Sequence, residues 1–155
     1  MKICFAASSG GHFQQLMRLS PLMDKYDGFI VTEEAGNTGD ESRKTYYLKQ
    51  VNRKEKDFIF KLIKNRKESK EILIREKPDA VICTGVLAMI PLMLIAKRRG
   101  ILVIYIESFA KVNTPTLTGK LMYHFADYFF VQWESMKTVF PKAIYKGLIV
   151  KRSKA

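Results

Sequence analysis

The strongest constraint in this sequence is the alternation of short, almost wholly apolar segments with segments of helical periodicity. Strands without a polar face are typical of sheets that are buried on both sides. We expect strands at residues 2–7, 29–32, 46–48, 80–83, 101–106, 128–132 and 143–150, the last of them interrupted by Gly147. Because helices must cover both faces of such a sheet, the predicted fold is Rossmann-like α/β, with a mostly parallel sheet between two layers of helices.

The segments between these strands predict helices. Residues 55–76 place apolar side chains such as Phe58 and Leu62 on one side and lysines on the other, which indicates a long amphipathic helix. We also expect helices at residues 13–19, 86–97, 117–126 and 134–140. The helix at 86–97 is very apolar, and two interpretations remain open for it: packing between the sheet and a neighbouring element, or contact with a membrane.

The first predicted strand leads directly into Ser8, Ser9, Gly10, Gly11 and His12, and a helix follows. Glycines allow a tight turn and a close approach of phosphate to the backbone, and a helix N-terminus favours an anion. The pattern is neither the dinucleotide-binding fingerprint nor a P-loop. Spacing alone leaves two hypotheses: a phosphate-binding loop with His12 facing the ligand, or a structural turn in which one of the serines caps the helix.

Three of the predicted strands end in residues that are capable of chemistry. These are the serine–glycine–histidine segment at 8–12, the pair Thr84-Gly85 and the pair Glu107-Ser108. Ligands of parallel sheets bind beyond the carboxyl ends of the strands, so we expect the three segments to form one site. Glu107 ends a buried strand and its carboxylate needs a partner. It either binds a substrate hydroxyl, orients His12, or caps the following helix.

The positive charge of the chain is concentrated in one region. The formal net charge is +12, and residues 43–77 hold 13 Lys and Arg against five Asp and Glu. Such a basic region suits an anionic membrane surface or nucleic acid, although a solvated helix face has the same composition. Exposed aromatic residues interleaved with the basic ones, and any known nucleic-acid motif, are missing, so we expect no nucleic-acid partner.

Length and cysteine content limit the organisation of the chain. A chain of 155 residues forms one domain by default, which we place at residues 1–150, with a basic tail at 151–155. Cys4 and Cys83 lie in predicted strands and are expected to be buried, reduced thiols. We predict no metal site and no cofactor. Neither a signal peptide nor an apolar segment of about 20 residues is visible, so we expect a cytoplasmic protein.

Several motifs resemble one family. They are Ser8-Ser9-Gly10-Gly11-His12, Cys83-Thr84-Gly85, Tyr105-Ile106-Glu107-Ser108-Phe109-Ala110, Leu117-Thr118-Gly119-Lys120-Leu121-Met122-Tyr123, Ala126-Asp127 and Val131-Gln132-Trp133. In this order they are similar to the acceptor-side, membrane-associated subunit of the split UDP-GlcNAc transferase of N-glycan synthesis. They also resemble its bacterial counterparts in capsule and exopolysaccharide assembly, the PssD-like or glycosyltransferase-enhancer proteins. More distantly, the layout resembles the N-terminal half of MurG, a GT-B glycosyltransferase.

The resemblance implies half of an enzyme, one subunit of a hexosyltransferase complex that is inactive alone. A partner chain would bind the UDP-sugar, and this chain would present a lipid-diphosphate acceptor. The residues expected to bind the acceptor and its phosphates are Ser8, Ser9, Gly10, Gly11, Thr84, Gly85 and Ser108. His12 is the candidate general base, because histidine exchanges a proton near neutral pH, and Glu107 is the second candidate catalytic residue.

The resemblance also implies a membrane and a protein partner. Eukaryotic members have an N-terminal anchor that this sequence does not show. We therefore expect peripheral contact with the anionic inner face of the cell membrane, through residues 43–77 and the helix at 86–97. Leu148, Ile149 and Val150 are expected to contact the donor-binding subunit in a heterodimer. A nucleic-acid-binding module and a self-sufficient small-molecule enzyme of doubly wound fold remain the alternative hypotheses.

Overall fold

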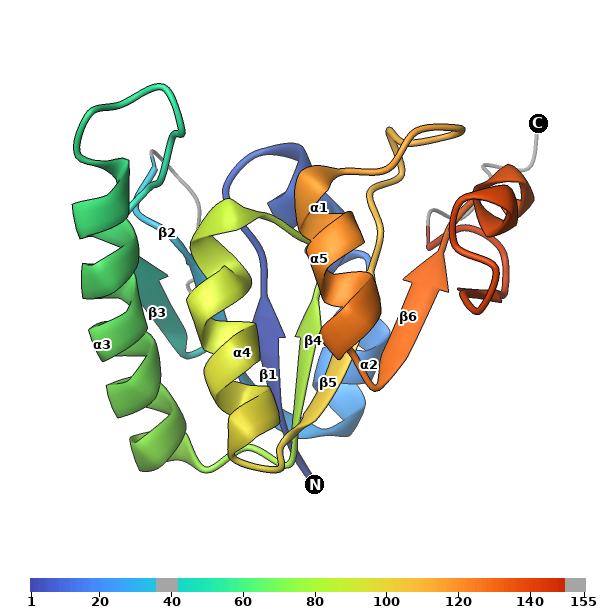
Figure 1. The fold of residues 1–155 in the computed structure, drawn as a ribbon. Coiled ribbons are helices and arrows are strands. Elements are labelled where there is room, and N and C mark those ends of the chain that lie inside the picture. The colour runs from blue at the N-terminus through green and yellow to red at the C-terminus, as the bar shows by residue number, and fades with distance from the viewer. Residues whose placement is uncertain (36–41, 150–155) are drawn as a thin grey trace.

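A parallel β-sheet forms the centre of the molecule (Figure 1). The computed structural model describes residues 1–35 and 42–149. The strands in the described part of the chain are β1 (Lys2–Ala6), β2 (Asp27–Glu33), β3 (Thr45–Leu48), β4 (Ala80–Cys83), β5 (Leu102–Ile106), β6 (Tyr128–Val131) and β7 (Ile144–Tyr145). Their spatial order is β3-β2-β1-β4-β5-β6-β7, and every neighbouring pair is parallel. The predicted Rossmann-like sheet is confirmed.

Helices cover both faces of the sheet. The helices are α1 (Gly11–Met17), α2 (Ser20–Lys25), α3 (Phe58–Glu76), α4 (Ile90–Arg98) and α5 (Leu117–Phe125), with short 3-10 segments at Leu87–Met89 and Glu134–Thr138. In Figure 1, α3, α4 and α5 lie in front of the sheet and α1 and α2 lie behind it. The buried residues form two clusters, one on each face of the sheet. Helices α3, α4 and α5 contribute to one cluster, and helices α1 and α2 contribute to the other.

Strand β1 shows how the sequence serves both faces. Ile3 and Phe5 belong to the cluster under α1 and α2, whereas Cys4 belongs to the cluster under α3, α4 and α5. This alternation follows from the two-residue repeat of a strand and explains why the segment has no polar face. Cys4 and Cys83 are buried free thiols, as predicted, and burial raises the pKa of Cys83 to about 12.

The structure supports the packing interpretation for much of the apolar segment at 86–97. It begins as the 3-10 segment, and α4 starts at Ile90 with Pro91 in its first turn, a position that tolerates the missing N–H of proline. Leu92 and Met93 are fully buried against the sheet. Leu94 and Ile95 are half-buried and line a surface groove. Within the described residues, no helix is both long enough and apolar enough to cross a membrane.

The predictions for the C-terminal region were partly wrong. The strand expected at residues 143–150 is confined to Ile144–Tyr145, and Gly147, the expected interruption, adopts a φ of +89°. The helix expected at 134–140 is the 3-10 segment at Glu134–Thr138. Val150 and the basic tail at 151–155 lie outside the described residues.

A buried carboxylate fastens α3 to the amino edge of the sheet. Glu76, at the end of α3, is 5% exposed and accepts hydrogen bonds from Lys2, Lys44 and Tyr46. Burial alone would raise the pKa of Glu76, but these hydrogen bonds outweigh burial and lower the pKa from its ordinary value of 4.5 to about 2. Glu76 therefore stabilises the fold in its ionised form.

Glu76→Gln should lower the free energy of unfolding at pH 7 by about 1–3 kcal/mol, because it removes the charge that Lys2 and Lys44 share. The lowered pKa means that the contribution is complete above pH 4.5 and is lost as the pH falls towards 2. Urea unfolding at several pH values should show the gap between variant and parent narrowing below pH 4.5. Glu71→Gln, at an exposed position of α3, is the control. A gap that is constant with pH would contradict the assignment.

Candidate functional site

The candidate site lies where the direction of the chain connections changes. Strands β1 and β4 are neighbours, but β1 leads to α1 behind the sheet and β4 leads to α4 in front of it. Ligands of doubly wound folds bind at this point. The two loops are joined here: the Ser8 N–H donates to the Gly85 carbonyl at 2.8 Å, and the Thr84 hydroxyl donates to the His12 carbonyl at 2.8 Å.

The ring of His12 has a fixed orientation. Its Nδ1 lies 2.8 Å from the Thr84 carbonyl oxygen. A carbonyl only accepts, so Nδ1 carries the proton in this contact and Nε2 of the neutral ring retains its lone pair. Gly85 makes room for the ring, since a Cβ there would lie 3.0 Å from Nδ1. The half-buried His12 is thus held as a hydrogen-bond acceptor at the strand ends.

The two serines of the first loop do not cap α1. The helix begins after Gly10 without a side-chain cap, so the hypothesis of a serine-capped turn was wrong. Ser8 is buried, and the N–H and hydroxyl of Ser9 both donate to the Glu33 carboxylate at 3.1 Å. Gly10 and Gly11 are exposed. Of the predicted phosphate-binding loop, the glycine backbone is therefore the part that faces solvent.

Glu33 is a site residue that the sequence analysis missed. It ends β2, is 4% exposed, and also accepts a hydrogen bond from the Val51 N–H at 3.3 Å. Glu33 therefore links the first loop to the loop between β3 and α3. Asn65 of α3 fixes the same loop, because its side chain exchanges hydrogen bonds of 2.9 and 2.8 Å with the backbone of Lys49. Two features of the sequence could have identified these residues: Glu33 is a polar residue at a strand end, and Asn65 lies on the apolar side of a predicted helix.

Glu107 supports the start of α5. It is 1% exposed and accepts hydrogen bonds from the Ser108 N–H at 2.8 Å, the Thr116 hydroxyl at 3.0 Å and the Thr116 N–H at 3.3 Å. Thr116 in turn caps α5 by accepting from the Gly119 N–H at 2.7 Å. Three roles were expected for Glu107: binding a substrate hydroxyl, orienting His12, or capping the following helix. The contacts agree with the third role, which Glu107 fulfils through Thr116. Ser108 is also buried, and its hydroxyl accepts from the Ala110 N–H at 3.3 Å.

Gly119 explains why two distant motifs occur together. A Cβ at Gly119 would lie 1.8 Å from Oε2 of Glu107, so no other residue type fits against that carboxylate without rearrangement. The Glu-Ser pair after β5 and the Thr-Gly pair in α5 therefore lie against each other, through the contact between Glu107 and Gly119.

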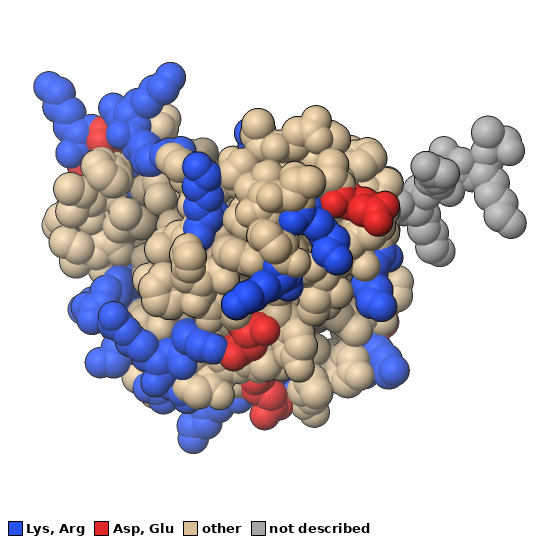
Figure 2. All heavy atoms as spheres, turned by 45° about the vertical axis from the view of Figure 1, so that its right-hand side comes forward, with Lys and Arg blue, Asp and Glu red and all other residues tan. Residues whose placement is uncertain are grey.

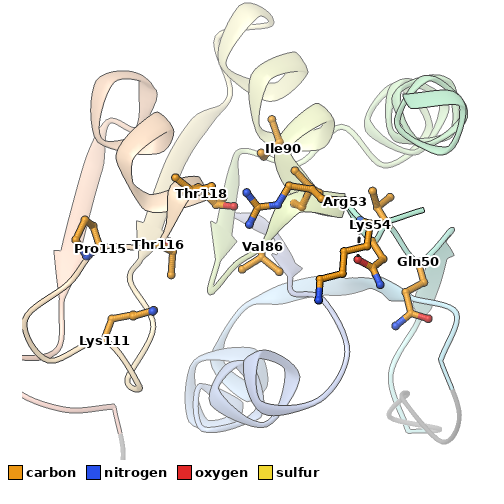
Figure 3. A pocket seen from close by; sticks show the side chains of 13 residues that line it. Gln50, Arg53, Lys54, Val86, Ile90, Lys111, Pro115, Thr116 and Thr118 are labelled. Atoms are coloured by element: carbon orange, nitrogen blue, oxygen red, sulfur yellow. Dashed lines mark hydrogen bonds between the residues drawn. The ribbon is translucent and has the colours of Figure 1, made fainter. Parts of the chain in front are cut away.

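A cleft of about 820 Å³ lies at the same edge of the sheet (Figure 3). The loop at residues 50–54 forms one wall, and residues 111 and 115–118 form the opposite wall. Three basic side chains, those of Arg53, Lys54 and Lys111, point from the two walls towards the space between them. We call this space the cationic cleft. Sequence reasoning counted Arg53 and Lys54 only as part of a basic region and did not consider Lys111.

Among the residues that the structure describes, the cations of the cleft have no acidic partner. None of its lining residues is acidic, and in the part of the chain that the structure describes none of the three forms an ion pair. Val86 forms part of the cleft, and it directly follows the Gly85 that contacts His12. The cleft therefore begins one residue along the chain from the glycine that makes room for the His12 ring.

Of the residues predicted to contact a partner, Ile149 is joined to Gln132, which directly follows β6. The amide of Gln132 donates to the Gln15 side chain and to the Glu107 carbonyl, both at 2.9 Å, and accepts from the Ile149 N–H at 3.3 Å. Ile149 packs against the cluster under α1 and α2. Leu148 and Ile149 are half-buried, so this segment lies beside α1 at the carboxyl edge of the sheet.

Comparison with known proteins identifies the family. A family profile described as "Oligosaccharide biosynthesis protein Alg14 like" matches residues 49–149. The chain belongs to the Alg14-like family. It is 29% identical to the UDP-N-acetylglucosamine transferase subunit ALG14 of Rattus norvegicus over 96% of this chain and 82% of the relative. The identity to the Homo sapiens subunit is 27%, over 97% of this chain and 83% of the relative.

Solved structures share the fold of this Alg14-like chain. MurG of Acinetobacter baumannii superposes with a TM-score of 0.74 at 17% identity, over 95% of this chain and 44% of MurG. UDP-N-acetylglucosamine 2-epimerase of Rickettsia bellii has a TM-score of 0.74 at 14% identity, over 96% of this chain and 45% of the epimerase. The chain thus spans less than half the length of these proteins, and at such identities the likeness concerns the fold.

Gly119→Ala should lower the free energy of unfolding by about 3 kcal/mol, because the new methyl group collides with the buried Glu107 carboxylate. Gly11→Ala is the matched control, since nothing lies within 4 Å of a Cβ there. We expect the control to change stability by less than about 1 kcal/mol. Urea unfolding monitored by circular dichroism measures both, and equal effects would contradict the Glu107 contact.

Proposed function

We propose that this chain is the non-autonomous, acceptor-presenting subunit of a two-chain glycosyltransferase. The observation that carries the proposal is membership of the Alg14-like family, whose relatives are named as subunits of a UDP-N-acetylglucosamine transferase. Residues 1–150 form the acceptor-binding domain, and a donor-binding partner supplies the UDP-sugar. The acceptor is a lipid-linked diphosphate. The bacterial resemblance of the sequence motifs supports capsular or exopolysaccharide synthesis as the pathway.

His12 acts as the general base in this proposal. Nε2 of His12 takes the proton of the acceptor hydroxyl while the hydroxyl oxygen forms its bond to C1 of the donor sugar. The bond between C1 and the UDP oxygen breaks, and UDP leaves with that electron pair. The Thr84 carbonyl keeps the ring in the tautomer that this step needs. Glu107 is a positioning residue, because its carboxylate holds the wall of the cleft through Thr116.

The phosphate groups of the acceptor lie along the carboxyl edge of the sheet. Gly10 and Gly11 leave exposed backbone there, beside Thr84 and Gly85, whereas Ser9 and Ser108 support the loops through internal hydrogen bonds. The segment with Leu148, Ile149 and Val150 is proposed as part of the partner contact. Its support is the position of Ile149 at the same edge, joined to Gln132.

The membrane contact is proposed for the face formed by α3 and α4. Figure 2 shows Lys and Arg over much of the left-hand and lower parts of one face, with few Asp and Glu between them. A hollow between the two helices is lined by Ile95 together with Arg66, Lys67, Lys70, Arg98 and Arg99. Such a surface suits the anionic inner face of the cell membrane, where each Lys or Arg contributes roughly 1 kcal/mol.

The isolated chain should transfer no sugar, because the donor-binding surface belongs to its partner. The test is incubation with UDP-N-acetylglucosamine and a lipid-diphosphate sugar acceptor, with and without a donor-binding subunit. Product formation is measured by chromatography of the lipid fraction. Turnover by the chain alone would overturn the proposal.

His12→Ala should reduce transfer by the assembled complex by about 10²–10⁴-fold, the usual loss for a general base. Because His12 is at the start of α1 and only half-buried, the variant should fold normally. His124→Ala is the matched control, since His124 is exposed on α5. Equal rates for the two variants would show that His12 is not the base.

A further inference from the structure

A pair of glutamine amides connects four segments at the carboxyl edge of the sheet. Gln15 lies on α1, and Gln132 directly follows β6. Gln132 is 2% exposed, and its Nε2 donates to Oε1 of Gln15 and to the Glu107 carbonyl, both at 2.9 Å. Oε1 of Gln15 also accepts from the Phe109 N–H at 3.0 Å, and Oε1 of Gln132 accepts from the Ile149 N–H at 3.3 Å. The two amides therefore join α1, the segments after β5 and β6, and the C-terminal segment.

The orientation of both amides is determined by their partners. A backbone N–H only donates, so the Phe109 N–H requires Oε1 of Gln15 to face it. That oxygen and the Glu107 carbonyl are both acceptors, so Gln132 must turn its Nε2 towards them. Its Oε1 is then left for the Ile149 N–H, and every polar group of Gln132 has a partner. An ionised glutamate at position 132 would have the same shape but no hydrogen to donate, so these contacts need an amide.

Phe109 is a firm point of attachment for Gln15. The Phe109 carbonyl accepts from Nε1 of Trp133 at 2.7 Å, and the centroids of the two rings lie 5.3 Å apart. Because the Phe109 N–H is bound to Gln15, both backbone polar groups of Phe109 are engaged. The segment after β5 therefore holds the end of the Gln15 side chain in one place.

Gln15 lies on the same side of α1 as His12, because residues three positions apart in a helix are neighbours on its surface. His12 reaches the Thr84 carbonyl after β4, whereas Gln15 reaches the segments after β5 and β6. Helix α1 has seven residues and no side-chain cap, and a helix of that length has little stability of its own. Phe13 and Leu16 bury one side of it, and Gln15 supplies polar contacts on the side that carries His12.

We propose that Gln15 and Gln132 are positioning residues for His12, and that the C-terminal segment at 148–149 controls them through the Ile149 N–H. The inference rests on the proposed function, because it names what orients the general base and links it to the segment proposed for the partner contact. A partner that binds residues 148–149 holds Ile149 against Gln132. It thereby stabilises the orientation of His12 without placing a residue of its own beside the ring.

The first test is nitrogen-15 NMR of the His12 ring in the full chain, at a pH well above about 6.5, where a free imidazole is neutral. The Thr84 carbonyl keeps the proton on Nδ1, so the two ring nitrogens of the parent should resonate far apart. Gln15→Leu should bring the two signals closer together, because a loosened α1 lets the ring exchange between its tautomers. Gln14→Leu, at the neighbouring exposed position, is the matched control. Equal His12 spectra for the two variants would overturn the inference.

The second test measures hydrogen exchange of the Phe109 amide. In Gln132→Glu, the amide of Gln15 should turn its Nε2 towards the new carboxylate, so that the Phe109 N–H loses its acceptor and exchanges about tenfold faster or more.

Ile149→Pro tests the same connection from the C-terminal segment, and it keeps the inference testable if Gln132→Glu does not fold. It removes the N–H that Gln132 accepts, so the Phe109 amide should exchange about threefold faster or more. Ile149→Ala is the matched control, because it shortens the side chain but retains the N–H. Equal exchange of the Phe109 amide in these two variants would contradict the inference.

The third test is catalysis by the assembled complex. Gln15→Leu should lower kcat by about 10- to 100-fold, since a displacement of about 1 Å is enough for a loss of this size. The KM for the UDP-sugar should stay unchanged, because the partner binds the donor. A kcat equal to that of Gln14→Leu would show that Gln15 does not position the base.

These results are separable from the proposed function, because the ring and amide measurements need no sugar transfer. If the complex transfers sugar and depends on His12, but Gln15→Leu leaves the His12 spectrum unchanged, the inference fails and the proposed function stands. If the ring and the amide respond as expected but the complex transfers no sugar to a lipid-diphosphate acceptor, the connection between the segments stands and the proposed function fails.

Discussion

The position of β1 between β2 and β4 is the constraint on which the rest of the structure depends. Because both pairings are parallel, strands β1, β2 and β4 all end at one edge of the sheet. Because the chain leaves β1 and β4 towards opposite faces, those two loops diverge at the edge where doubly wound folds bind ligands. The hydrogen bonds between the loops, including that from Thr84 to the His12 carbonyl, then fix the loops relative to each other.

Two buried carboxylates maintain the walls of the site. Glu33 accepts hydrogen bonds from the first loop and from the loop at 50–54, and Glu107 accepts them from the start of α5. A buried carboxylate without such donors would be costly, so each one requires its loop to keep a single conformation. The acidic residues therefore shape the site, whereas the groups that can meet a ligand are His12 and the basic residues of the cationic cleft.

The fold was predictable from the sequence because its signals are local. Apolar runs and helical periodicity located the strands and helices, and the strand ends located the edge that carries the site. The failures have tertiary causes. Glu107 contacts Gly119, and Lys111 lines the same cleft as Arg53, so both features depend on residues that are separated in the sequence. The last predicted strand ends at Tyr145, two residues before Gly147, which was expected to interrupt it and adopts a positive φ.

The net charge of +12 has several structural uses. Lys2 and Lys44 neutralise Glu76 and hold α3 against the sheet. These two positive charges therefore stabilise the fold. Arg53, Lys54 and Lys111 have no acidic partner among the described residues, so their mutual repulsion favours an anion between them. Arg66 and Arg98 border the surface groove between α3 and α4, where their charged ends can remain in water or contact anionic head groups while their stems cover aliphatic side chains. The same helix face therefore combines attraction to an anionic surface with exposed aliphatic side chains.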